Sequence, residues 1–210
     1  MIKVLIADDH AVVRRGLKQI LADQPDMAVL GEAQNAREAL QLLRQQSWDV
    51  LVLDLALPDR SGLEVLGEVR QRYPRLPVLV LSVHPEEQFA VRVLKAGAAG
   101  YLPKEGAPEE LVQALRKVQA GGRYVSASLA ERLALSLQNG GPEPPHERLS
   151  DREYQVLCLI ASGRTVGEIA DRLVLSVKTV STYRARLLDK MGLRTNAELT
   201  CYAVRNRLVD

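Results

Sequence analysis

Short apolar runs alternate with stretches of helical periodicity in the first half of the chain. The runs at residues 4–7, 50–53 and 78–81 are too short for helices, and their continuity is typical of strands buried on both faces. In residues 36–43 and 63–70, which lie between these runs, apolar side chains recur every three or four positions, as on one face of a helix. The repeated βαβα order predicts an α/β domain built on a doubly wound parallel sheet.

Helix starts are marked by a repeated pair of residues in both halves of the chain. In a capping box, a short polar side chain and a glutamate three residues later satisfy backbone donors at the first turn of a helix. The pattern predicts helix starts at Asn35/Glu38, Ser61/Glu64, Ser150/Glu153, Thr165/Glu168 and Thr195/Glu198, with a further start at Ser176. Residues 149–210 are therefore expected to form four short helices in a compact all-α bundle.

Two of these helices are joined by a tight connection. The predicted helices at residues 165–173 and 177–191 are separated only by residues 174–176, as in a helix-turn-helix motif. One arc of the longer helix is apolar and is expected to face the bundle; it consists of Val177, Val180, Leu187, Leu188 and Met191. The opposite face is left for a partner.

The middle of the chain has the composition of a linker. A short helix is expected around residues 128–138, and residues 139–148 then contain three prolines and two glycines, which oppose a packed core. We therefore divide the chain into a first domain at residues 1–122, a short helix and linker at 123–148, and a second domain at 149–210.

Polar side chains follow the predicted strands of the first domain. Asp8, Asp9, Asp54, Ser82 and Lys104 all leave the carboxyl ends of strands, which converge on one crevice in an open parallel sheet. Three carboxylates at close range repel one another, so a cation is needed to balance them. Oxygen ligands of high charge favour Mg²⁺, which often bridges carboxylates to phosphate oxygens. The pattern therefore indicates phosphoryl chemistry.

The exposed face of the helix at 177–191 carries small, hydroxyl-bearing and cationic side chains, which suit the major groove of DNA. Candidates for base contacts are Lys178, Ser181, Thr182 and Ala185. Candidates for phosphate contacts are Lys178, Thr179, Tyr183, Arg186 and Lys190. Arg184 falls within the apolar arc, so its guanidinium is expected to reach outward past packed neighbours rather than to read a base.

Net charge supports DNA binding only weakly. Residues 149–210 contain 10 Lys and Arg against 7 Asp and Glu, whereas residues 1–121 contain 15 against 16. Charge spread evenly at this level is typical of a solvated surface, so affinity for DNA must depend on where the cations are placed.

Composition excludes several other classes of protein. No stretch approaches the length of an apolar membrane span, and Met1 opens directly into a strand without the features of a signal peptide, so we expect a cytoplasmic protein without a membrane partner. Two cysteines and three scattered histidines indicate neither a disulfide framework nor a transition-metal site. His10 is expected to cap or pack, and His84 either influences water access at the pocket rim or is an exposed loop residue.

Residues 1–122 resemble the receiver domain of two-component response regulators, which implies a five-stranded, flavodoxin-like sheet. Asp8 and Asp9 resemble the acidic pair that holds Mg²⁺ in this family. Asp54 matches the aspartate that accepts the phosphoryl group, and Ala56 would give its backbone carbonyl to the metal. Asp54 and Ala56 lie in the motif that spans residues 53–58. The resemblance therefore implies a metal site formed by Asp8, Asp9, Asp54 and Ala56.

Three further residues match the switch positions of the receiver family. Ser82 corresponds to the hydroxyl residue that meets the phosphoryl oxygens, Tyr101 to the aromatic that turns inward with it, and Lys104 to the cation that pairs with the phosphoryl oxygens. A carboxylate nucleophile needs a metal and a lysine to offset developing charge, which agrees with this assignment.

Residues 149–209 resemble the LuxR-type, or NarL/FixJ-type, output domain of response regulators. The motifs that carry this resemblance lie at residues 149–153, 168–170, 176–180 and 190–193. Tyr183 departs from the family pattern, in which histidine is common, and residues 163–167 lack the asparagine and lysine that often occur there. Both departures bear on the phosphate contacts.

Together the two resemblances imply a DNA-binding transcription regulator, not an enzyme, controlled by phosphorylation of Asp54. The implied partners are double-stranded DNA, a sensor histidine kinase as phosphodonor and a second copy of the chain in a phosphorylated homodimer, with RNA polymerase as a further candidate. A dimer would place two recognition helices one helical turn apart on DNA.

Two other functions are disfavoured by the same residues. Haloacid-dehalogenase-like phosphatases need a second aspartate two positions after the nucleophile, and Ala56 occupies that position. A flavodoxin-like cofactor binder needs a phosphate loop rich in Ser, Thr or Gly after the first strand, where residues 8–10 are Asp, Asp and His.

Overall fold

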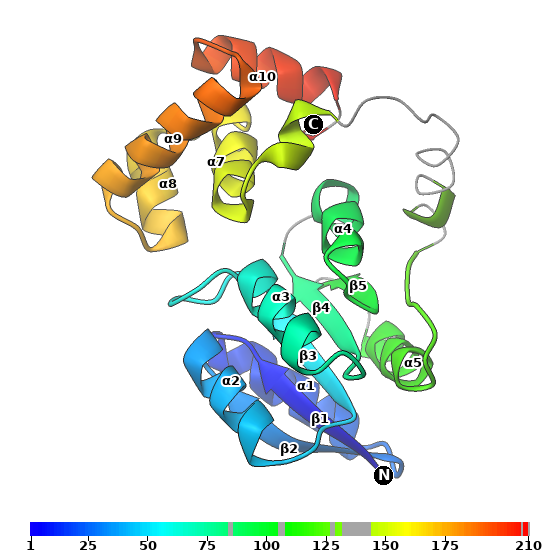
Figure 1. Ribbon diagram of the computed structural model, residues 1–210. Helices are drawn as coiled ribbons and strands as arrows, with labels where there is room; N and C mark the ends of the chain where they lie inside the picture. The colour runs from blue at the N-terminus through cyan, green and yellow to red at the C-terminus, as the bar shows by residue number, and fades with distance from the viewer. Residues whose placement is uncertain (84–85, 105–107, 127–128, 132–143, 207, 210) are drawn as a thin grey trace. The chain divides into compact units, whose positions relative to one another are not determined.

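The computed structural model describes residues 1–83, 86–104, 108–126, 129–131, 144–206 and 208–209. Contacts within the chain define two units, Met1–Ser136 and Leu137–Asp210. Figure 1 shows an α/β fold in the first unit and a helical fold in the second, so the predicted fold classes are confirmed.

The first unit is built on a parallel five-stranded sheet with the strand order β2-β1-β3-β4-β5. Its strands are β1 (Ile2–Ala7), β2 (Met27–Ala33), β3 (Val50–Asp54), β4 (Val78–Ser82) and β5 (Gly100–Pro103). Every residue of β3 and β4 is buried, which explains why their apolar runs are continuous rather than alternating. The edge strand β2 has a mixed burial pattern, and its register with β1 shifts between Val4 and Leu5.

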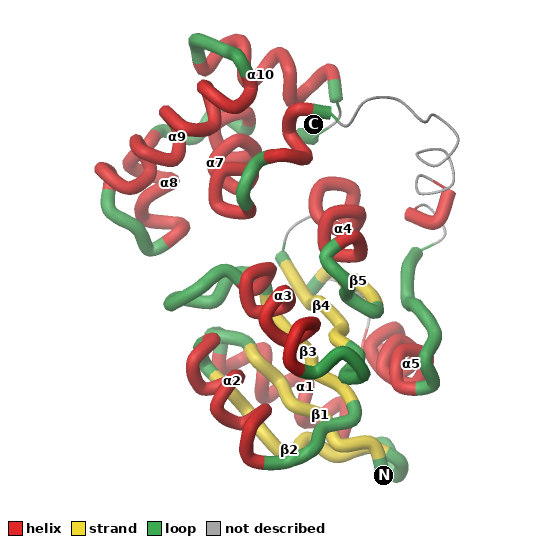
Figure 2. The backbone as a smooth tube through the Cα atoms, in the orientation of Figure 1, coloured by secondary structure: helices red, strands yellow, loops and turns green. Residues whose placement is uncertain are grey.

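Helices alternate with the strands and cover both faces of the sheet. They are α1 (Ala11–Ala22), α2 (Ala36–Gln45), α3 (Gly62–Arg72), α4 (Glu86–Lys95) and α5 (Pro108–Gln119). Helices α1 and α5 contact each other and share a core cluster with β1, β3 and β4. Helices α2 and α3 also contact each other and lie in front of the sheet in Figure 2. The carboxyl ends of the parallel strands therefore meet at one open edge.

The predicted helix starts of the first unit are correct, although their hydrogen bonds differ in detail. The Asn35 side chain accepts from the backbone of Glu38. The Glu38 carboxylate accepts from the Gln34 backbone and from the Asn35 side-chain amide, but not from the Asn35 backbone. Ser61 caps α3 by accepting from the Leu63 backbone, so the capping box predicted for this position with a glutamate at residue 64 is wrong.

Residues 123–126 belong to the first unit and pack against its sheet and α4. Tyr124 forms a bridge with Gly100 of β5, and its backbone donates to Ala99 at 2.9 Å. Ser126 donates from its backbone and its hydroxyl to the carboxylate of Glu86, at the start of α4. The segment after α5 is thus fixed to β5 and α4. His84, most of the helix predicted around 128–138 and residues 139–143 of the linker lie outside the described residues.

The second unit contains a compact set of helices. They are η1 (Pro145–Arg148), α7 (Asp151–Ala161), α8 (Val166–Leu173), α9 (Val177–Met191) and α10 (Asn196–Arg205). Helices α8 and α9 contact each other across a tight connection, in which Val174 ends α8 with a φ of 54°. The unusual left-handed conformation of this β-branched residue forms the sharp turn of a helix-turn-helix.

Capping in the second unit follows the sequence closely. Ser150 and Thr165 form complete capping boxes with Glu153 and Glu168. Thr195 caps α10 as predicted, but the glutamate three residues later accepts from the backbone of residue 194 instead of the cap residue. These caps fix the bounds of the helices that carry the site described below.

Of the five residues in the buried arc predicted for α9, three are correct, Leu188 is only partly buried, and one is wrong. Val180, Leu187 and Met191 are buried, whereas Val177 is 56% exposed. Val177 is the first residue of α9 and lies in a turn that extends past the packed core, so helical periodicity alone misplaced it.

The end of the predicted linker packs as part of the second unit. Residues 145–148 form η1, which contacts α9. His146 lies 2.8 Å from the Tyr202 hydroxyl through its Nδ1 atom, and its ring also contacts Tyr154. Proline-rich composition predicted an open segment here, but these aromatic contacts hold it against α7 and α10.

Candidate functional site

An ion-paired carboxylate cluster lies at the carboxyl edge of the sheet. Asp54 is the last residue of β3, and Asp8 directly follows β1, its neighbour in the sheet. Both residues are 1% exposed. The Nζ atom of Lys104, just after β5, lies 2.7 Å from Oδ2 of Asp54 and 2.7 Å from Oδ2 of Asp8. The topology therefore brings together three residues that are far apart in sequence, as predicted.

The electrostatics of this cluster follow from burial and from the shared lysine. Burial raises the pKa of Asp54, and the charge of Asp8 adds to the rise, whereas Lys104 acts to lower it. Burial acts to lower the pKa of Lys104, but the two carboxylates outweigh it and hold that pKa above its usual value. Lys104 therefore remains a cation that neutralises part of the charge on the aspartates.

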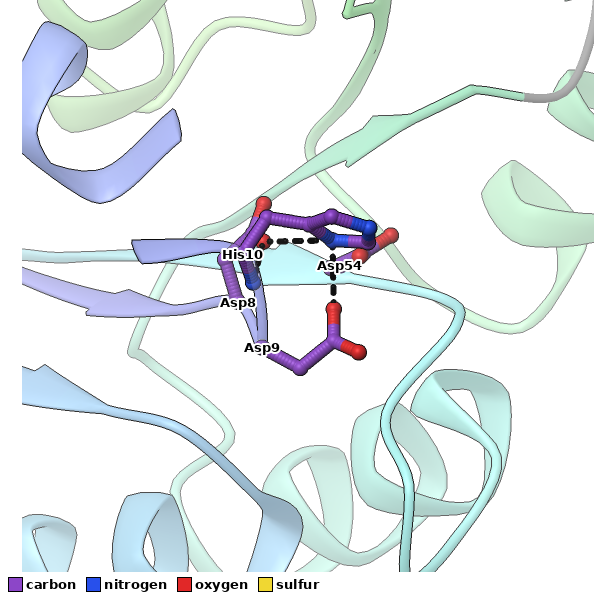
Figure 3. A group of neighbouring side chains, drawn as sticks. All are labelled: Asp8, Asp9, His10 and Asp54. Carbon is purple, nitrogen blue, oxygen red and sulfur yellow. Dashed lines mark hydrogen bonds and ion pairs between the residues drawn. The ribbon is translucent and has the colours of Figure 1, made fainter. Parts of the chain in front are cut away.

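Asp9 and His10 complete a group of metal-binding atoms at the pocket. In Figure 3, dashed lines join the His10 ring to the carboxylate of Asp9 below it and to that of Asp8 beside it. The Nδ1 atom of His10 lies 2.6 Å from Asp9 Oδ1 and 3.3 Å from Asp8 Oδ1. One ligand atom from each of Asp8, Asp9, His10 and Asp54 lies within 4.8 Å of the others. Three carboxylates in so small a space fit a hard divalent cation such as Mg²⁺.

His10 meets the expectation that it caps or packs only in part. Its backbone caps α1, but its side chain forms no cap hydrogen bond and is 58% exposed beside the aspartates. Sequence reasoning missed this contact, and the only available signal was that His10 directly follows Asp8 and Asp9 in the loop after β1.

Of the remaining predicted pocket residues, Ser82 and Ala56 lie at the same edge of the sheet, whereas Tyr101 lies two residues before the end of β5. Ser82 is fully buried at the end of β4, and its backbone carbonyl accepts from the Lys104 amide at 2.7 Å. Tyr101, in β5, is 1% exposed. The amide of Ala56 donates to Asp54 Oδ1 at 3.2 Å, which orients the carboxylate.

Close packing behind Asp54 fixes the end of β3. A Cβ atom added at Gly62, the first residue of α3, would lie 2.2 Å from the Asp54 carbonyl oxygen and 2.6 Å from Leu55 Cα. Both neighbours are backbone atoms, so a larger residue cannot be accommodated without moving the strand that carries Asp54. Sequence reasoning did not identify Gly62.

The face of α9 opposite its buried arc carries the predicted DNA-binding residues. Exposed on this face are Lys178, Ser181, Thr182, Ala185, Arg186 and Lys190, with Thr179 and Tyr183 partly exposed. The hydroxyls of Thr179 and Thr182 bond within the helix, to Ser176 and to the Lys178 carbonyl. Arg184 donates to Asn196 at 2.6 Å and thus points toward α10.

Lys190 differs from the other cations on α9 because it has a buried partner. Its Nζ atom lies 2.7 Å from Glu153 Oε2, and the Glu153 residue is 2% exposed. Among the described residues, none forms an ion pair with Lys178 or Arg186. The structure therefore brings seven predicted contact residues to a free face and places the eighth, Lys190, in an ion pair.

Two family models match consecutive segments of the chain. Residues 4–116 match the response regulator receiver domain, and residues 147–203 match the luxR family of bacterial regulatory proteins. An α/β receiver with an acidic pocket, followed by a helix-turn-helix unit, defines a class of two-domain regulators. The chain belongs to the response regulators of two-component systems that carry a LuxR-type output domain, which are DNA-binding transcription regulators.

Relatives of known name match over nearly their whole length. Response regulator GacA of Pseudomonas aeruginosa is 42% identical over 211 residues, which cover 100% of this chain and 99% of the relative. Response regulator UvrY of Escherichia coli strain K12 is 39% identical, with 100% of this chain and 97% of the relative covered.

Solved structures of RcsB have a similar fold. RcsB from Salmonella enterica serovar Typhimurium, bound to promoter P1flhDC in the presence of phosphomimetic BeF3-, is 30% identical, with a TM-score of 0.64 over 96% of this chain and 97% of that chain. Two RcsB dimers bound to two parallel DNAs form a structure that is 29% identical, with a TM-score of 0.59 over 100% of this chain and 99% of that chain. In the described part of this chain, no helix has the length and apolar character needed to span a membrane.

Proposed function

We propose that phosphorylation of Asp54 controls DNA binding by this transcription regulator. The observation that carries the proposal is the buried Asp54 carboxylate, with one oxygen 2.7 Å from the Lys104 ammonium and two further aspartates beside it. A carboxylate held next to a cation and a metal-binding cluster is suited to attack on phosphorus, because both charges offset the negative charge that develops.

The transfer is a simple exchange at phosphorus. An Oδ atom of Asp54 forms a bond to phosphorus while the bond from phosphorus to the imidazole nitrogen of a sensor histidine kinase breaks, and that imidazole leaves with the bonding electron pair. Asp8, Asp9, Asp54 and the Ala56 carbonyl would hold Mg²⁺, which supplies charge neutralisation. Lys104 pairs with the added phosphoryl group, because that group adds about 1.5 to 2 negative charges and three acceptor oxygens, by analogy with phosphoserine.

Ser82 and Tyr101 are the proposed switch residues. The Ser82 hydroxyl is at the pocket edge and can rotate to donate to a phosphoryl oxygen. Tyr101 lies on the neighbouring strand β5 and is buried in the described structure. Because Tyr101 is already buried, a Ser82 hydroxyl drawn toward the phosphoryl group would stabilise this inward position of the ring, which shifts the population toward the active state.

The proposed DNA-binding surface is the free face of α9. Lys178, Ser181, Thr182 and Ala185 read bases, while Thr179, Tyr183 and Arg186 join Lys178 in contacts to phosphates. The solved structure of RcsB dimers on DNA supports a DNA-bound homodimer. We propose that phosphorylation favours this dimer, which would place the recognition helices in two half-sites. RNA polymerase is a further proposed partner.

We propose that these functions are divided among the three segments predicted from the sequence. Residues 1–122 receive the phosphoryl group, residues 123–148 connect, and residues 149–210 bind DNA. We assign the protein to the cytoplasm, where kinase and DNA are accessible, and to regulation rather than to enzymatic turnover.

The test compares the wild type with Asp54→Asn, each with and without acetyl phosphate and Mg²⁺. The DNA probe is a duplex that the wild-type chain selects from a random-sequence pool, and mass in solution is measured in parallel. The proposal requires donor and Mg²⁺ to tighten binding and to raise the mass of the wild type only. Equal binding by the wild type under all conditions contradicts it. Trp48 fluorescence confirms that the variant is folded, because the one tryptophan of the chain is buried in the first unit.

A further inference from the structure

We propose that Lys190 positions the recognition helix through Glu153 and does not contact DNA phosphates. This inference rests on the proposed function, in which α9 enters the major groove. The exposed location of Lys190 on α9 groups it with the predicted phosphate contacts, but its ion pair with Glu153 indicates a different role. Lys190 is therefore a positioning residue, whose effect on DNA binding is indirect.

The contact between Lys190 and Glu153 joins the end of α9 to the start of α7. Glu153 is in the first turn of α7, and Lys190 is in the last turn of α9. Glu153 Oε2 accepts from Lys190 Nζ at 2.7 Å and from the Ser150 backbone at 2.7 Å. The same carboxylate thus completes the capping box of α7 and fixes the end of the recognition helix.

Burial makes this pair difficult to exchange for a contact with DNA. The Glu153 side chain is 3% exposed, whereas that of Lys190 is 44% exposed. If the ammonium moved to a phosphate, a buried carboxylate would lose the one cation that pairs with it among the described residues, and removing one partner of such a pair is strongly unfavourable. Since Glu153 already neutralises it, Lys190 also releases few counterions from DNA. Lys178 and Arg186 lack such a partner among the described residues.

The pair lies at the opposite end of α9 from Lys178, so a small change in helix tilt at Lys190 moves Lys178 by a larger distance. Residues 178 and 190 are separated by about 18 Å along the axis of α9, given the rise of an α-helix. A tilt of about 10° at the Lys190 end would displace Lys178 by roughly 3 Å at this helical rise. Such a displacement is larger than hydrogen bonds to base edges tolerate. Loss of the pair should therefore impair sequence reading more than general attraction to DNA.

The experiment measures dissociation constants across a series of salt concentrations for the full-length chain with acetyl phosphate and Mg²⁺. The two probes are a duplex selected by the wild type and a scrambled duplex of the same composition. Lys190→Met should weaken binding to the selected duplex by about tenfold or more, with little effect on the scrambled duplex. The slope of log affinity against log salt should stay at the wild-type value, and Lys190→Arg should restore binding.

Glu153→Gln provides an independent arm, because Glu153 is buried and cannot touch DNA. The variant should reproduce the selective loss seen with Lys190→Met. If instead Lys190→Met lowers the salt slope by about 0.9 and weakens both duplexes equally, Lys190 contacts a phosphate and the proposal is wrong. Unchanged affinity in either variant would overturn it too.

Two controls separate this proposal from folding and from the proposed function. If either single variant is unfolded, the double variant Glu153→Gln/Lys190→Met removes the pair without leaving a lone buried charge, and it should fold yet read sequence poorly. Hydrogen exchange in α7 and α9 verifies folding. Lys178→Ala tests the interface itself: if it retains wild-type affinity and slope, α9 is not the DNA-binding face and the proposed function fails, whatever Lys190 does.

Discussion

Lys104 places its Nζ atom 2.7 Å from Oδ2 of Asp54, across 50 residues of sequence. The same atom lies 2.7 Å from Oδ2 of Asp8, so one ammonium serves two carboxylates that are each almost fully buried. A lysine in this place has two consequences: it stabilises the folded first unit, and it provides a cation at the proposed site of phosphoryl transfer.

Removal of this cation should destabilise the first unit. Lys104→Met leaves two buried carboxylates without their shared partner, and we expect the free energy of unfolding to fall by about 3 kcal/mol. Mg²⁺ should recover more stability in the variant than in the wild type, because the metal replaces a missing positive charge. Urea unfolding followed by Trp48 fluorescence, with and without Mg²⁺, measures both effects. A loss well below about 1 kcal/mol, or an equal response to Mg²⁺, would contradict this view of the pocket.

Gly62 should be essential for the position of Asp54. Gly62→Ala brings a methyl group against the Asp54 carbonyl and Leu55 Cα, and we expect about 2 kcal/mol of destabilisation together with slower phosphorylation by acetyl phosphate. Gly67→Ala is the matched control, since it lies in the same helix and a Cβ there would meet nothing within 4 Å. That control should raise stability by about 0.5 to 1 kcal/mol through helix propensity and leave phosphorylation unchanged. Equal behaviour of the two variants would show that the close contact is unimportant.

The second unit should lose stability on the acid side through Glu153. Burial acts to raise the pKa of this carboxyl, but hydrogen bonds from Lys190 and Ser150 outweigh it and hold the pKa below its ordinary value of 4.5. The folded-state pKa is thus the lower one, so the stabilisation is present above the unfolded value and is lost as pH falls through the folded value.

Hydrogen exchange of α7, corrected for the intrinsic effect of pH, measures this loss. Wild-type protection should fall as pH drops below about 4.5, in the range where the unfolded carboxyl binds its proton first. Glu153→Gln should be less protected at neutral pH and should respond less to acid. Glu198→Gln is the control, because Glu198 caps α10 without an ion pair among the described residues. A wild-type acid response that survives in Glu153→Gln would assign it to another group.

The architecture and the acidic pocket could be predicted because each depends on a local pattern combined with one topological rule. Four-residue apolar runs located β1, β3 and β4, and the shared edge of parallel strands then placed Asp54 beside Asp8 and Lys104. The edge strand β2 gives a weaker signal, since one of its sides is unpaired and its burial is mixed.

Features that depend on side-chain direction or on long-range packing could not be predicted in this way. The His10 ring turns toward Asp9 because of the loop after β1, and no periodicity encodes that direction. The contact of His146 with Tyr202 joins residues 56 apart, which made a proline-rich segment part of a folded unit. The pairing of Lys190 with Glu153 could not be predicted either, because helical spacing shows which face a residue occupies but not its partner on another helix.

Two arginines in α9 allow a direct test of which cations touch DNA. Arg186 is exposed, and no described residue forms an ion pair with it, whereas Arg184 donates to Asn196 at 2.6 Å. Arg186→Ala and Arg184→Ala make the same change in net charge two positions apart. If Arg186 contacts a phosphate, its removal should lower the slope of log affinity against log salt by about 0.9, and it should weaken selected and scrambled duplexes alike.

Arg184→Ala should leave that slope unchanged, because its guanidinium is directed to α10 rather than to the groove. Equal slopes for both variants would mean that affinity follows net charge alone, and the helix-turn-helix geometry would then have no part in placing the phosphate contacts. A difference between two substitutions of identical charge can only come from position. The comparison therefore separates a defined interface on α9 from a diffuse attraction between a slightly basic unit and DNA.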